Sequence, residues 1–154
     1  MSSKKASDSN KSFAGFSDAE RKAMQDRVKE LELEASGGKL KGKAKAEKAV
    51  LDTIAAMPEA DRSMAEHIHA LVQKHAPALS PKTMYGMPAY ANSDGKVVCF
   101  FQAASKWETR YAALVFEDKA ELDEGTMWPT AFAITELNAE NEKRVAELIQ
   151  RAAP

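Results

Sequence analysis

The chain has 154 residues, of which 44% are hydrophobic and 29% are charged, and its formal net charge is −1. This length is that of one compact domain, and the near-zero charge excludes bulk electrostatic attraction to nucleic acid or to a membrane surface. A single cysteine, Cys99, excludes an internal disulfide and is typical of a reducing compartment. No stretch approaches the ~20 apolar residues of a membrane helix. We therefore expect a cytoplasmic protein with neither a membrane nor nucleic acid as its partner.

The first 48 residues differ in composition from the rest of the chain. The leading residues are small, polar and basic, and such a segment buries too little apolar surface to fold, so we expect a disordered basic tail at 1–16. Residues 17–48 are predicted to form a helical extension and a lysine-rich linker, "KLKGKAKAEK". The linker is more typical of a solvated segment than of a nucleic-acid patch, because no aromatic residues accompany its lysines. Residues 49–154 are predicted to form the folded domain.

The helix of the extension carries a start signal and a narrow apolar stripe. Ser17 and Glu20 match a capping box, in which the hydroxyl accepts a backbone N–H and the carboxylate accepts the N–H of Ser17 itself. Two glycines at 37–38 end the helix. The apolar stripe consists of Met24, Val28 and Leu31. Because the other faces are charged, this helix needs a partner surface in its own domain or in another chain.

Helices and strands follow in separate groups. Apolar side chains at helical spacing predict helices over about 44–57 and 59–75, separated by Pro58, and a last helix capped by Asn138 with a buried stripe of Val145, Leu148, Ile149 and Ala152. Short runs rich in Val, Phe, Tyr and Ala predict strands at 82–85, 88–92, 96–103, 110–116 and 130–134. The segment "NSDGK" predicts a hairpin turn, and "EDKAELDEG" an acidic turn or short helix.

This order of elements predicts the fold class. Strands joined by short turns must be antiparallel, and segregated helices and strands indicate an α+β domain. We therefore predict a two-layer sandwich, in which an antiparallel sheet carries N- and C-terminal helices packed on one face.

The segment "YGMPAY", residues 85–90, predicts a sharp corner that leads into a strand. Gly86 permits a backbone bend that a Cβ would resist, and Met87 is pushed into an extended conformation by the proline that follows it. Pro88 cannot donate to a strand ladder, so it belongs at a strand start or at an edge. The corner places Tyr85 and Tyr90 at defined positions, but it supplies no nucleophile.

Together with "GKVVCFFQAASKWETRYAALVF", "LDEGTMWPTAFAI" and the final amphipathic helix, this segment resembles the YdhG-like domain of unknown function. The resemblance covers roughly residues 51–152. It implies a small α+β sandwich with an antiparallel sheet. Some members of the family are described as frataxin-like iron chaperones, so the resemblance also implies weak iron binding or delivery, with Fe²⁺ as the metal and iron–sulfur assembly proteins or self-association as the partners.

One acidic run is the best metal candidate in the sequence. Carboxylates are hard oxygen ligands that suit Fe²⁺, Mn²⁺, Mg²⁺ or Ca²⁺, and the run consists of Glu117, Asp118, Glu121, Asp123 and Glu124. It lacks the ordered spacing of a calcium loop, and a solvated turn after a strand is the favoured alternative.

The histidines and the cysteine offer weaker candidates. His67 and His69 are two residues apart on one predicted helix, so they face in different directions. Glu66 and His69 share a face and can supply two ligands, but structural or exposed roles are favoured for all three histidines, with His75 at the edge of the core. Cys99, between valine and phenylalanine, is predicted to be a small buried hydrophobe rather than a catalytic thiol.

Aromatic residues in or beside the predicted sheet offer a second candidate function. If helices cover one face of the sheet, large side chains on the other face can line a pocket or a self-association surface, with core packing as the favoured alternative. The candidate ligand or partner surface consists of Tyr85, Met87, Tyr90, Trp107, Arg110, Tyr111 and Trp128. Since no nucleophile and base converge in the sequence, a non-enzymatic recognition module is favoured over an enzyme.

Overall fold

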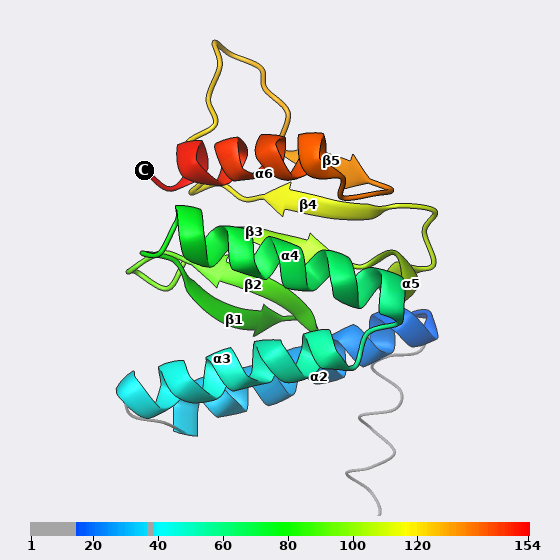
Figure 1. The fold of residues 1–154 in the computed structure, drawn as a ribbon. Helices are drawn as coiled ribbons and strands as arrows, with labels where there is room; N and C mark the ends of the chain where they lie inside the picture. The colour runs from blue at the N-terminus through cyan, green and yellow to red at the C-terminus, as the bar shows by residue number, and fades with distance from the viewer. Residues whose placement is uncertain (1–14, 37–38) are drawn as a thin grey trace, which may run out of the picture.

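The computed structural model describes residues 15–36 and 39–154. The predicted tail therefore lies outside the described residues except for its last two positions, and so does the predicted glycine helix end at 37–38. The helices are α2 (Asp18–Ser36), α3 (Lys39–Ala55), α4 (Glu59–His75), α5 (Ala104–Trp107) and α6 (Ala139–Ala152), and the strands are β1 (Ser80–Met84), β2 (Met87–Ala91), β3 (Val97–Gln102), β4 (Ala112–Phe116) and β5 (Ala131–Ile134) (Figure 1). Within the described residues, no helix combines the length and the apolar composition needed to span a membrane.

The five strands form one sheet in the order β1-β2-β3-β4-β5, and each strand is antiparallel to its neighbours. The chain thus adds each strand beside the previous one, because short turns join them. In the β2–β3 turn, Asn92 Oδ1 accepts the N–H groups of Asp94 and Lys96 at 3.0 Å each, and Gly95 has a φ of 77°. The predicted α+β fold and antiparallel sheet are confirmed.

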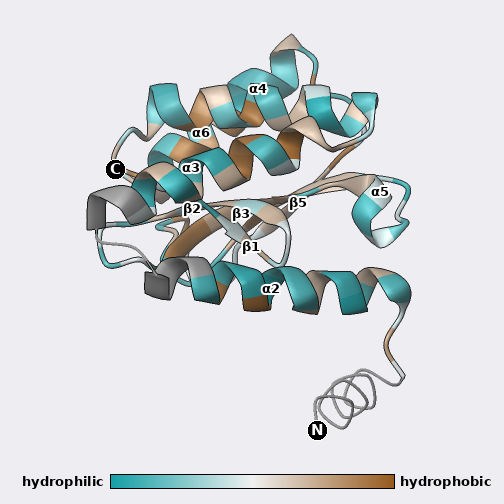
Figure 2. Cartoon of the chain, turned by 90° about the horizontal axis from the view of Figure 1, so that it is seen from below, coloured by the Kyte–Doolittle hydropathy of each residue, from teal (hydrophilic) through white to brown (hydrophobic). Residues whose placement is uncertain are grey.

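Helices flank the sheet. Helices α4 and α6 pack against each other on one face, as predicted, whereas α2 lies on the other side of the sheet and α3 packs along β1 and β2 (Figures 1 and 2). The extension at 17–48 therefore packs against the same sheet as the rest of the chain.

The core lies between the sheet and helices α3, α4 and α6. Side chains alternate along β3 and β4, so that every second residue faces these helices, and Cys99, Phe101 and Leu114 have no exposed surface. In α6 the predicted cap is confirmed, since Asn138 Oδ1 accepts the N–H of Asn141 at 2.9 Å. The predicted stripe is also confirmed: Val145, Ile149 and Ala152 are buried, and Leu148 packs against the core.

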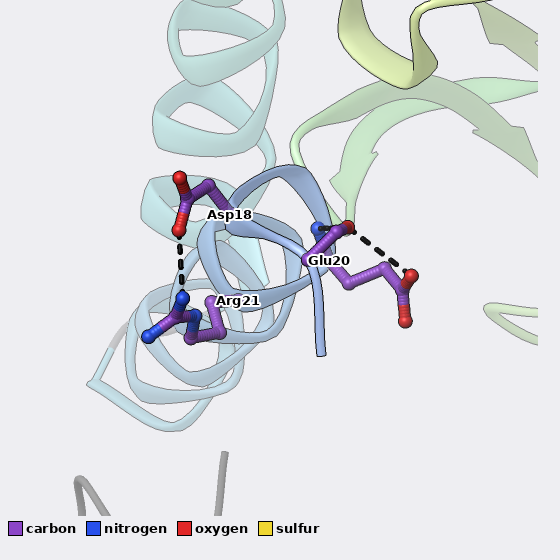
Figure 3. Close-up of polar contacts among 4 residues, drawn as sticks. Asp18, Glu20 and Arg21 are labelled. Atoms are coloured by element: carbon purple, nitrogen blue, oxygen red, sulfur yellow. Dashed lines mark hydrogen bonds and ion pairs between the residues drawn. The ribbon is translucent and has the colours of Figure 1, made fainter. Parts of the chain in front are cut away.

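Helix α2 begins with half of the predicted capping box (Figure 3). Ser17 Oγ accepts the N–H of Glu20 at 3.1 Å, as expected. The Glu20 carboxylate, however, accepts the Ser17 hydroxyl at 3.1 Å instead of its backbone N–H. Beside it, Arg21 donates to Asp18 Oδ1 at 2.7 Å.

The face that α2 turns towards the protein differs from the one that its apolar stripe indicates. Val28 and Leu31 are 52% and 48% exposed, whereas Ala23 and Glu30 are buried. The charged face is turned inwards because carboxylates on it meet hydrogen-bond donors of the β1–β2 turn, as described below.

Helix α3 covers the segment predicted as a linker. It begins at Lys39 rather than near Ala44, so the lysine-rich stretch is helical. Lysine and alanine are both good helix formers, and the Lys48–Asp52 ion pair at 2.8 Å joins residues one turn apart. The composition that suggested a linker is equally the composition of a solvated helix.

Candidate functional site

A cavity of about 640 Å³ lies between α2, α3, α5 and the first three strands. Its apolar wall includes Met57, Met87, Phe101 and Ala103. Its charged side chains are Lys22, Asp26, Lys29, Glu30, Asp52 and Lys106. Among the described residues that line this cavity there is no histidine and no cysteine. The cavity is therefore lined by both apolar and charged side chains.

The β1–β2 turn forms one end of the cavity. Tyr85 and Gly86 have φ angles of 51° and 74°, so this two-residue hairpin turn has the conformation that favours glycine at its second position. The N–H groups of these two residues point the same way and donate to the two carboxylate oxygens of Glu30 at 3.0 and 2.9 Å. Successive amides in such a turn form a concave anion site, and Glu30, which is 7% exposed, fills it.

Two further charges meet at the same turn. Lys106 Nζ lies 3.7 Å from Asp26 Oδ2, with 16% of the lysine side chain exposed. A Cβ on Gly86 would collide with the Asp26 carboxylate and lie 2.7 Å from Lys106 Nζ, so both groups close directly over the glycine. Burial lowers the pKa of Lys106, and the neighbouring Lys22 also lowers it, while Asp26 opposes both effects.

Arginine completes the contacts of this turn with α2. Arg27 Nη1 lies 3.6 Å from Glu30 Oε2, and the Arg27 guanidinium lies 5.8 Å from the centre of the Tyr85 ring. Tyr85 remains 42% exposed, so the ring forms an outer rim of the contact.

The structure does not gather the predicted aromatic surface in one place. Met87 lines the cavity and Tyr90 lies in the core, while Trp107 belongs to α5. Tyr111 is exposed, with the Arg110 guanidinium 5.2 Å from its ring centre. Trp128 packs on the core from the loop before β5 and lines a separate hollow. Of the seven predicted residues, Met87 lines the cavity and Tyr85 lies in the turn beside it.

The acidic run lies in the loop between β4 and β5. Its five carboxylates, Glu117, Asp118, Glu121, Asp123 and Glu124, are exposed, and Glu124 pairs with Arg151 at 3.1 Å. Within the described part of the chain, no group of three or more histidine, cysteine, aspartate or glutamate side chains is arranged to hold a metal ion. Iron binding by this run stays a prediction of the resemblance, and the geometry adds no support to it.

The histidines occupy three different environments. His67 is exposed, His69 is buried, and His75 Nδ1 lies 2.9 Å from Nε2 of Gln150 on α6. His69 Nδ1 lies 2.9 Å from the Tyr90 hydroxyl, and its Nε2 is buried without a hydrogen-bond partner in the described chain. His69 is therefore a structural residue that holds α4 on β2.

The burial of His69 makes stability depend on pH. Burial lowers the pKa of His69 from its ordinary 6.5, against an opposing effect of Glu47 on α3. Between this lowered native pKa and 6.5, the unfolded chain binds a proton that the native state does not. The free energy of unfolding should therefore fall by at most about 1.4 kcal/mol for each unit by which the pH is lowered through this range. Urea unfolding between pH 5 and 8 measures this slope. His69→Gln should reduce it and His67→Gln should not; equal slopes in both variants would contradict the assignment.

The structure is that of a small α+β protein with a cavity lined by both apolar and charged side chains. Comparison of the chain with protein-family models, with curated proteins and with solved structures finds no match. The resemblance to YdhG-like proteins therefore stays a prediction, and the function has to be argued from the cavity itself.

The residues that define the cavity include several that sequence reasoning missed. Asp26 and Glu30 are four residues apart on one helix, and this spacing is a signal that two carboxylates share a face. The sequence does not show which surface that face meets. Lys106 lies between the strands predicted at 96–103 and 110–116, and only the tertiary fold brings it over Gly86.

Proposed function

We propose that this protein is a non-enzymatic recognition module that binds one small amphipathic molecule in the cavity between α2, α3 and the β1–β2 turn. The observation that carries the proposal is the cavity of about 640 Å³, which lies within the usual range of about 300–1,000 Å³ for ligand sites. Its apolar wall suits the body of the molecule, and its charged lining side chains suit a polar group.

The lining side chains support binding rather than chemistry. Cys99 lies in the core, and burial raises the pKa of its thiol to about 12, so it is not a nucleophile at neutral pH. The charged side chains that line the cavity are lysines and carboxylates, several of which are already paired. This set orients a ligand but does not supply a nucleophile with an adjacent base.

A neutral fluorescent probe tests the cavity. N-phenylnaphthylamine should bind to the full chain at one saturable site, since its rings match the apolar wall. Ala49→Trp fills the cavity from α3 and should lower the affinity of the protein for the probe by at least about tenfold. Ala19→Trp fills it from α2 and should do the same.

A matched control separates filling of the cavity from a general effect of tryptophan. Ala55 is exposed on the same helix as Ala49 and does not line the cavity. Ala55→Trp should therefore keep the affinity of the wild-type protein. If both lining variants bind the probe as tightly as Ala55→Trp does, the cavity is not the binding site and the proposed function is wrong.

A further inference from the structure

The β1–β2 turn and α5 together offer three donors to an anion. The N–H groups of Tyr85 and Gly86 are directed at one point, and the Lys106 ammonium closes over Gly86 from the side. Two adjacent amides match the two oxygens of one carboxylate, and a lysine that is largely removed from water strengthens the attraction.

Helix α2 places two carboxylates beside these donors. Asp26 and Glu30 are one turn apart, so they share a face of the helix. The Glu30 carboxylate accepts hydrogen bonds from both amides. Asp26 Oδ2 lies 3.7 Å from Lys106 Nζ, which is beyond hydrogen-bond distance. In this structure α2 therefore occupies the anion site with its own side chains.

The remaining attachment of α2 is weak. Of its side chains that the structure describes, Ala23 and Glu30 are the buried ones, while Val28 and Leu31 are about half exposed. Five residues of the helix line the cavity, namely Ala19, Lys22, Asp26, Lys29 and Glu30. A helix held mainly by charge contacts over an unfilled space can leave at a lower cost than one held by a packed apolar face.

We propose that the amides of Tyr85 and Gly86, with Lys106, form a carboxylate-binding site, and that the ligand of the cavity is an amphipathic monocarboxylic acid that displaces Glu30 and Asp26 of α2. This inference rests on the proposed function, because the body of the acid fills the cavity. The carboxylate takes the two amides, and the apolar chain lies against Met57, Met87 and Phe101. Helix α2 is then an exchangeable lid whose own carboxylates compete with the ligand.

Decanoate and decan-1-ol are the probes, since they share an apolar chain and differ in the carboxylate. In competition with N-phenylnaphthylamine at pH 7.4, decanoate should bind the wild-type chain at least about tenfold more tightly than the alcohol. Lys106→Met should lower the affinity for decanoate and leave the affinity for decan-1-ol unchanged. Equal affinities of the two probes for the wild-type chain would overturn the inference, even if both bind the cavity.

Removal of the charge of Glu30, which competes with the ligand for the site, gives a second test. Glu30→Gln keeps the shape of the side chain and removes its charge, so decanoate should bind this variant about tenfold more tightly than wild type. Glu32→Gln, at an exposed position two residues away on α2, is the matched control and should change nothing. An unchanged decanoate affinity in Glu30→Gln would show that α2 does not compete for the site.

Amide hydrogen exchange reports the position of the lid. Saturating decanoate should speed exchange in α2 while the amides of Tyr85 and Gly86 stay protected, because the ligand replaces Glu30 as their acceptor. Exchange that slows in α2 would mean that the ligand binds beneath a closed helix, and the displacement would be wrong. If no probe binds to the wild-type chain at all, the proposed function fails and this inference fails with it.

Discussion

Replacing Phe101 by alanine should lower the free energy of unfolding by about 3–5 kcal/mol. The ring has no exposed surface, and it lies in the central strand β3, where it is opposite Leu114 of β4. Truncation removes the transfer free energy of the ring and leaves a hole that the neighbouring strands cannot close. Since domains of this kind are stable by about 5–15 kcal/mol in total, the loss is a large share of the whole. Urea unfolding followed by circular dichroism measures it.

Phe100 is the matched control for this prediction. It is the neighbouring residue of the same strand, so its side chain points to the opposite face of the sheet, and it is only partly buried. Phe100→Ala should cost about 1 kcal/mol, because part of its ring is in water in both states. If the two variants lost the same stability, the assignment of the faces of β3 would be wrong.

The sheet and its helices were predictable because local signals and tertiary packing agree there. Val98 to Phe101 form a short apolar run bounded by turn signals, and the structure places the run in the central strand, where a helix and a neighbouring strand surround it. The C-terminal helix carries both its cap and its stripe in the sequence, and both lie where the spacing puts them. In such segments one physical cause, the burial of a periodic apolar face, determines both the pattern and the structure.

Helix α2 shows where that reasoning stops. Its strongest apolar positions, Val28 and Leu31, face solvent, while Glu30 between them is buried. Periodicity assigns the apolar side of a helix to the interior. Here two amides of a distant turn stabilise a buried carboxylate by hydrogen bonds, and this interaction is more specific than the partial burial of a narrow apolar stripe. The partners are 55 and 56 residues away in the chain, so no local pattern contains this information.

The residues of the predicted aromatic surface lie in different places for a related reason. Aromatic residues near a sheet can share a face, so Tyr85, Tyr90 and Trp128 are predicted to lie together, yet strand register decides which face each one takes. Tyr90 pairs with Cys99 and turns into the core, where it meets His69. Tyr85 lies in the turn itself and stays outside. The sequence indicated the turn, but the use of its amides as an anion site depends on side chains from α2 and α5.

Cys99 should react with a thiol reagent at least about a thousandfold more slowly in the native protein than in the unfolded chain. Labelling requires that the reagent reaches the sulfur and that the sulfur is a thiolate. In the native state the Cys99 side chain has no exposed surface, and burial raises the pKa of its thiol to about 12. The reaction therefore has to wait for unfolding of β3. Release of thionitrobenzoate from Ellman's reagent measures the rate in buffer and in urea.

The same thiol then reports on the Phe101 variant without any denaturant. If labelling follows the population of opened molecules, a loss of about 3–5 kcal/mol in Phe101→Ala should speed the reaction of native Cys99 by about 10²–10⁴-fold. Ser93→Cys, at an exposed position of the β2–β3 turn, in a Cys99→Ala background gives the rate of an accessible thiol. A wild-type Cys99 that reacts as fast as that control would mean that β3 is not the buried centre of the sheet. Because Phe101 also lines the cavity, the position of the proposed binding site would then be wrong as well.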